Sequence, residues 1–133
     1  MIHPQIRRGD VFLKVLDTKK GSVQSGLRPV IVLQNDKQNM RSPTTIIAPL
    51  TSKTDKKRFM AAHIAVGTEF GLLKDSQILI EQLQTVSTAS LGPYIGHVDD
   101  DQILKAIDFG LCKTLGIRNY PIKSDSSEQE ASL

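Results

Sequence analysis

Short apolar runs between turn-forming residues constrain the fold of this chain most strongly. Its longest apolar runs are about five residues, too short for a membrane span or for the apolar part of a secretory leader. Six segments instead have the length and composition of β-strands, and Gly, Pro and polar residues separate them. These segments are residues 10–17, 29–33, 44–52, 61–67, 76–86 and 93–99. The pattern predicts a small, partly open barrel, in which Pro49 places its strand at an edge, a bulge or a strand end.

One further segment, residues 99–116, has the spacing of an amphipathic helix. Three Asp residues stand at its start, and Gly116 follows its last turn. We interpret the aspartates as a helix cap and a partner for the helix dipole, with a metal site as the alternative. The apolar positions of the helix are Ile103, Leu104, Ile107, Leu111 and Leu115.

The length of 133 residues, 39% of them hydrophobic, suits one domain with its own core. We assign residues 1–117 to this domain and residues 118–133 to a polar tail, whose last part, 123–133, is expected to be disordered because it has almost no apolar side chains. The single cysteine, Cys112, cannot form an internal disulfide, and its place in the helical pattern suggests a buried small hydrophobe. We expect a soluble, cytoplasmic protein with no membrane partner.

The net charge of +3 conceals an asymmetry along the chain. Residues 1–60 contain 12 Lys and Arg against 4 Asp and Glu, whereas residues 61–133 contain 5 against 10. The basic first half includes the segment KTDKKR at 53–58, which suits a polyanionic partner such as nucleic acid. A solvated loop is the alternative interpretation of the same segment.

Arg28 stands at the edge of the apolar run that continues through Pro29 to Leu33. Proline restricts the residue before it to extended geometry, so Arg28 projects from a stiff backbone rather than from a flexible loop. An arginine held in this way can present its guanidinium to a ligand. From position alone, an ordinary surface ion pair remains the alternative.

The remaining candidates for chemistry are polar residues at or near strand ends. The histidines at positions 3, 63 and 97 lack the spacing of metal ligands, and the chain contains neither a phosphate-binding Gly motif nor a nucleophile elbow. Metal-dependent and nucleotide-dependent enzymes are therefore disfavoured. Strand ends are where a rigid scaffold presents functional groups. The residues in question are Arg28, Thr51, Ser52, Glu81 and Gln82.

Four segments in succession resemble the motifs of the MazF/PemK toxins of bacterial toxin–antitoxin systems. They are RRGDVF (7–12), GSVQSGLRPVIVLQND (21–36), SPTTIIAPLTS (42–52) and DSQILIEQLQTV (75–86), and their order and spacing also match. The resemblance implies a mainly β fold with a C-terminal helix, a small SH3-like barrel of the CcdB/PemK type. It also implies a homodimer that cuts single-stranded RNA at short sequences without a metal or other cofactor, and that is inhibited by a MazE-like antitoxin segment.

The resemblance places the essential arginine and threonine of the family at Arg28 and Thr51. Attack of an RNA 2′-hydroxyl on its own phosphodiester builds negative charge on the phosphorus oxygens, and fixed donors aimed at that charge lower the barrier. Arg28 offers a cationic fork and Thr51 a hydroxyl. Neither is an obvious general base, which stays unassigned. We expect His63 to have a structural or RNA-contacting role, with the base as the alternative.

The RNA-binding candidates combine residues matched to the family with the basic loop. The family's usual acidic residue in the first loop is replaced by Val23, and an arginine common in relatives before Leu91 is absent, so no cleavage sequence is transferred. For Glu81 and Gln82, the alternative is a solvent-facing position in a sheet. The candidates are Ser22, Gln24, Ser52, Lys53, Lys56, Lys57, Arg58, Glu81 and Gln82.

Two other functions fit a barrel of this kind. A gyrase inhibitor of the CcdB type binds protein and has no nuclease chemistry, so it does not need Arg28 and Thr51 together. A non-catalytic RNA-binding barrel keeps the basic loop but does not depend on Thr51. Incubation of the purified protein with labelled single-stranded RNA in excess chelator separates the three functions.

Overall fold

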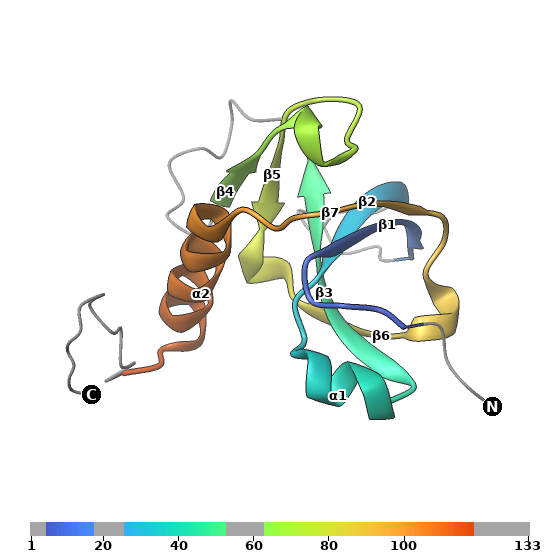
Figure 1. Ribbon diagram of the computed structural model, residues 1–133. Helices are drawn as coiled ribbons and strands as arrows, with labels where there is room; N and C mark the ends of the chain where they lie inside the picture. Colours follow the sequence, from blue (N-terminus) through green and yellow to red (C-terminus); the bar gives the residue numbers. More distant parts are fainter. Residues whose placement is uncertain (1–4, 18–25, 53–62, 119–133) are drawn as a thin grey trace.

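The computed structural model describes residues 5–17, 26–52 and 63–118 (Figure 1). A curled antiparallel sheet forms a half-barrel, and a C-terminal helix packs on one side of it, as the sequence predicted. The elements in chain order are β1 (Asp10–Leu16), β2 (Gly26–Val32), α1 (Asp36–Arg41), β3 (Thr44–Thr51), β4 (His63–Val66), η1 (Thr68–Phe70), β5 (Ser76–Leu79), η2 (Ile80–Gln82), β6 (Gln84–Ser87), η3 (Thr88–Ser90), β7 (Tyr94–His97) and α2 (Asp101–Leu115).

Strand β3 lies at the centre of the sheet. The strand order is β4-β5-β3-β2-β1-β7, and β6 also pairs with β3. The first half of β3, Thr44 to Ile47, pairs with β6, whereas Leu50 and Thr51 pair with β5. Pro49, which cannot donate a ladder hydrogen bond, falls between these two pairings. The prediction that Pro49 marks an edge, a bulge or a strand end was therefore wrong, because it lies inside a central strand where the partner changes.

The segment 76–86 is two strands and not the single strand that its sequence suggested. The chain pairs with the end of β3 through β5, turns through the 3₁₀ helix η2, and then pairs with the start of β3 through β6. Ile80 in this turn is fully buried. The apolar run continues through the corner because the corner itself packs in the core, so the run gives no sign of the break.

A short helix, α1, was also not predicted. Asn35 caps it by accepting a hydrogen bond from the Gln38 backbone N–H. Buried Asn39 then joins the helix to the sheet. Its side-chain oxygen accepts hydrogen bonds from the side-chain amide of Gln34 at 3.0 Å and from the Thr45 hydroxyl at 2.8 Å. Polar contacts rather than an apolar stripe hold this helix, so it has no periodic signal.

Helix α2 packs against β4 and η2 through an apolar face that includes the fully buried Ile107 (Figure 1). The Asp100 carboxylate accepts from the backbone N–H groups of Gln102 and Ile103, which confirms the predicted cap. Gly116 ends the helix with φ of 71°, as predicted. Cys112 is half-buried and so more accessible than the sequence suggested.

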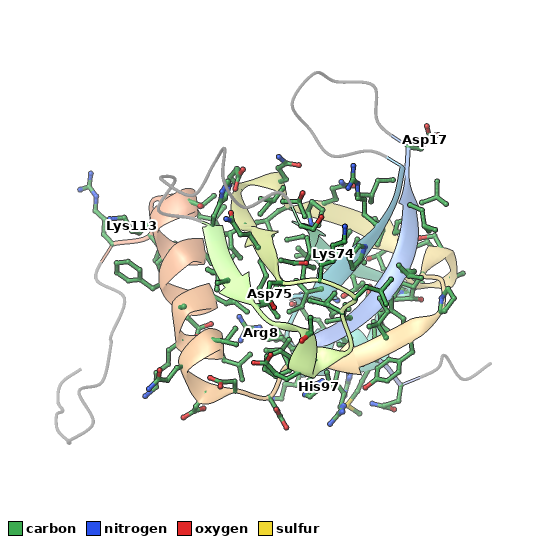
Figure 2. All side chains as sticks on the ribbon, turned by 90° about the horizontal axis from the view of Figure 1, so that it is seen from above. Arg8, Asp17, Lys74, Asp75, His97 and Lys113 are labelled. Atoms are coloured by element: carbon green, nitrogen blue, oxygen red, sulfur yellow. The ribbon has the colours of Figure 1, made fainter. Side chains whose placement is uncertain are left out.

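The RRGD segment fastens the start of the chain to the sheet and to α2. Arg8 donates from Nε to the Leu33 carbonyl at 2.9 Å and from its terminal nitrogen to the Asp108 carboxylate at 2.8 Å (Figure 2). Gly9 has φ of 99°, and a Cβ there would lie 2.8 Å from the Val98 carbonyl oxygen. The buried Asp10 carboxylate contacts the His97 ring at 2.7 Å. This motif is therefore structural in this chain.

Candidate active site

Arg28 lies within β2 and is half-buried. Its neighbour Pro29 is part of the same strand, and the register of β2 with β1 is unbroken from Gly26 to Ile31. The backbone at Arg28 is therefore extended and held by a neighbouring strand. This confirms that the arginine projects from a rigid element.

Thr51 is the last residue of the central strand, and its side chain is buried. Across the sheet it stands opposite Gln77 of β5, which is also buried. A hydroxyl at this place is fixed by strand pairing on a core element rather than carried by a loop. Such a group can be aimed at a substrate with little reorganisation.

The register of β2 with β3 aligns Arg28 with Thr51. Strands β2 and β3 pair antiparallel with Val30 opposite Pro49, and continuing this register by two residues places Arg28 opposite Thr51. Directly opposite residues point to the same face of a sheet, with Cβ atoms about 4.5 to 5.5 Å apart. We call the resulting line of side chains across four strands the polar row. It consists of Lys14, Arg28, Thr51 and Gln77.

An apolar groove of about 490 Å³ lies beside the polar row. Arg28, Ser52 and Lys74, which stands on the loop before β5, line it. Its apolar wall comes from Leu13, Pro29 and Leu50, each next in sequence to a member of the polar row. Arg28 therefore belongs both to the polar row and to the lining of the groove.

Ser52 and the η2 pair are the other predicted site residues that the structure describes. Ser52 is exposed, directly after Thr51. Glu81 and Gln82 lie in the 3₁₀ helix η2 and not on a strand, which corrects the sequence interpretation. The Glu81 carboxylate contacts His63 Nε2 at 2.9 Å.

His63 is placed as a structural residue. Its side chain is 1% exposed, and its ring Nε2 contacts the Glu81 carboxylate. In this conformation the buried ring has little access to an RNA chain lying on the surface. The geometry therefore supports the structural role over that of general base.

The other predicted RNA-binding residues lie outside the described part of the chain. They are Ser22, Gln24, Lys53, Lys56, Lys57 and Arg58. Within the described ranges, no group of three or more His, Cys, Asp and Glu side chains gathers as a metal site would require. No helix in these ranges is long and apolar enough to cross a bilayer.

Sequence reasoning did not single out two members of the polar row, Lys14 and Gln77. Each is a polar residue within an otherwise largely apolar strand, and this was the available signal. Their relation to Arg28 and Thr51 depends on register between strands distant in sequence. That register becomes known only from the folded sheet.

The fold and the site define a class of small β protein: a half-barrel of antiparallel strands with a C-terminal helix, which carries an arginine and a threonine on adjacent strands. Residues 7–114 match the family of PemK-like, MazF-like toxins of type II toxin–antitoxin systems. The chain belongs to this family.

Known proteins similar to the chain agree with this membership. It is 39% identical to endoribonuclease EndoA of Bacillus subtilis (strain 168) over 116 residues, which cover 86% of this chain and 98% of that protein. The fold is similar to that of MazF from Deinococcus radiodurans, with a TM-score of 0.72 at 16% identity, covering 86% of this chain and 100% of that one. It is also similar to an endoribonuclease solved in complex with its cognate antitoxin from a mycobacterial species, with a TM-score of 0.64 at 20% identity, covering 86% and 96%.

Proposed function

We propose that this protein is the toxin of a toxin–antitoxin system and acts in the cytoplasm as a metal-independent endoribonuclease on single-stranded mRNA. The observation that carries the proposal is the register of β2 and β3, which, continued by two residues from the Val30–Pro49 pair, aligns Arg28 with Thr51. Family membership and the identity to an endoribonuclease support it.

In the proposed reaction the RNA supplies its own nucleophile. The 2′-oxygen loses its proton and attacks the adjacent phosphorus, the bond to the 5′-oxygen breaks, and that oxygen gains a proton. The products are a 2′,3′-cyclic phosphate and a 5′-hydroxyl. Arg28 and Thr51 donate to the phosphoryl oxygens as their charge rises, and the Arg28 guanidinium, with its five N–H donors, also assists the leaving oxygen.

Substrate binding is assigned to the surface around this pair. Ser52 is exposed beside Thr51, and the segment that follows in the sequence contains Lys53, Lys56, Lys57 and Arg58, which supply charge for the RNA backbone. Ser22, Gln24 and Gln82 complete the proposed contacts. Glu81, bound to His63, contributes by holding the η2 turn next to β4.

Cleavage of labelled single-stranded RNA in excess chelator tests the proposal. The wild type is expected to cut, Arg28→Ala is expected to be nearly inactive, and Arg41→Ala, which removes an exposed arginine at the end of α1, is expected to cut normally. Normal cleavage by Arg28→Ala refutes the site assignment. RNA binding without cleavage by the wild type shows a non-catalytic barrel, and inhibition of DNA gyrase without RNA cleavage shows a CcdB-type function.

A homodimer is part of the proposed function, with the second copy packed beside the groove. Val15 and Leu27 stand opposite each other at the end of the β1–β2 pair, and both are more than 60% exposed. Leu73 at the groove is 98% exposed. Leu73→Glu is expected to give a monomer in sedimentation equilibrium, whereas the same change at exposed Leu115 on α2 leaves the dimer intact. The opposite result places the interface on α2.

The proposed inhibitor is an antitoxin segment with acidic and apolar residues. Such a segment complements both the apolar groove and the basic loops that carry Lys19, Lys20 and residues 53–58. Titrating the cognate antitoxin peptide into toxin bound to a non-cleavable RNA is expected to displace the RNA. A stable ternary complex with unchanged RNA affinity shows that the two sites are separate.

A further inference from the structure

Lys14 stands directly opposite Arg28 in the β1–β2 pair. Both side chains therefore leave the sheet on the same face, with Cβ atoms about 4.5 to 5.5 Å apart. Lys14 is half-buried, so part of its aliphatic stem is covered by the sheet and its neighbours. The polar row thus begins with two adjacent cations.

Two like charges directly opposite each other destabilise a strand pair. Among the described residues, no carboxylate lies within ion-pair distance of the Lys14 ammonium. The Lys14 ammonium is therefore available to an anionic ligand.

The order of the row decides which anion each cation faces. Arg28 lies between Lys14 on one neighbouring strand and Thr51 on the other. A phosphate held by Arg28 and Thr51 together lies on the β3 side of Arg28, one strand away from Lys14. Lys14 then faces the next phosphate of a chain that crosses the strands.

We propose that Lys14 binds the phosphate adjacent to the scissile one, so that RNA crosses β1, β2 and β3 along the polar row. This inference rests on the proposed endoribonuclease function and adds a substrate-binding residue to it. Lys14 acts through charge on substrate affinity, whereas Arg28 and Thr51 act on the reacting phosphate. A lysine suffices here because a flanking phosphate needs a positive charge and no fixed fork.

The test compares Lys14→Gln with Lys37→Gln, which removes an exposed lysine from α1, the helix that joins the far ends of β2 and β3. Binding is measured on an RNA with a 2′-deoxy scissile nucleotide, over a range of salt concentrations. Lys14→Gln is expected to weaken binding and to lower the logarithmic salt slope by about 0.7, the value for one phosphate contact on a single strand. Lys14→Arg is expected to keep the slope, and Lys37→Gln to change neither quantity.

A neutral methylphosphonate in the RNA identifies the contact. Placed at one of the two phosphates next to the scissile one, it is expected to weaken wild-type binding as Lys14→Gln does, and to have no added effect on Lys14→Gln. The proposal is overturned if the methylphosphonate, at both positions, weakens RNA binding by the wild type and by Lys14→Gln equally. It is also overturned if the salt slope of RNA binding by Lys14→Gln equals that of Lys37→Gln. If the wild type binds this RNA but does not cleave its all-ribose form, the endonuclease proposal fails by a separate readout.

Discussion

Replacing Thr51 by valine removes a hydroxyl from the site while nearly keeping the shape of the side chain. Thr51 is buried at the end of β3, so valine keeps most of the packing and removes the hydroxyl. Loss of one fixed donor to a developing oxyanion costs about 10²- to 10³-fold in rate, or about 2.7 to 4 kcal/mol of transition-state stabilisation. We expect a fall of this size in the rate of RNA cleavage at saturating RNA.

Thr45 provides a matched control within the same strand. It is fully buried, and its hydroxyl donates to the Asn39 side-chain oxygen at 2.8 Å. Thr45→Val therefore loses a structural hydrogen bond, which costs about 1 kcal/mol of stability. Because that oxygen also accepts from Gln34, it is not left without a donor. A lower melting temperature with a normal cleavage rate is expected.

Thr51→Ser completes the series because it keeps the hydroxyl and loses a methyl group. We expect it to retain most of the cleavage rate that Thr51→Val loses. Single-turnover cleavage of a labelled RNA, with melting temperatures measured on the same preparations, checks all three variants. If Thr51→Val cuts at the wild-type rate, or if Thr45→Val loses as much activity, Thr51 does not act on the phosphate.

Further expectations concern Arg28, the N-terminal cap of α2, residues 123–133, and the lysine pair at 56 and 57. Arg28→Lys should lose most cleavage activity, because a point charge does not replace a planar fork; wild-type single-turnover rates in this variant would contradict the assigned role. Asp100→Ala should lower the free energy of unfolding by about 1 kcal/mol in a denaturant titration, since its carboxylate caps α2, and an unchanged midpoint would argue against the cap. Deleting residues 123–133 should leave both melting temperature and cleavage unchanged, and a marked loss of either would show that the tail docks. Reversing the charges of Lys56 and Lys57 should weaken RNA and antitoxin binding together in parallel titrations, and a loss confined to one ligand would assign the loop to that ligand alone.

Local signals in the sequence predicted much of the fold. The helix was placed at 99–116 and spans Asp101–Leu115, because capping aspartates and a terminal glycine act through neighbouring backbone groups. The strand expected at 29–33 begins earlier, at Gly26, because pairing with β1 extends it. Features that depend on distant partners were not predictable: the turn at Ile80–Gln82 follows from pairing with both ends of β3.

The same distinction between local signals and distant partners applies to the candidate site. Arg28 was recognised because the following proline and apolar run are local, and the family resemblance named Thr51. Their juxtaposition and the places of Lys14 and Gln77 follow from strand register, which no single segment encodes. For the candidates within 18–25 and 53–62, which lie outside the described residues, the RNA-binding assignment stays a prediction.

The central claim is tested most directly by measuring cleavage, and the end groups of the products, for one RNA in two forms. One form is all-ribose and the other has a single 2′-deoxy nucleotide at the cleaved position, and both are incubated with the wild type in excess chelator. Because the 2′-oxygen is the proposed nucleophile, the all-ribose form should be cut to a 2′,3′-cyclic phosphate and a 5′-hydroxyl, and the deoxy form should stay intact. Cutting of the deoxy form at the same position, or ends carrying a 3′-hydroxyl and a 5′-phosphate, would contradict the assignment of Arg28 and Thr51 to a transition state formed by the RNA's own 2′-hydroxyl.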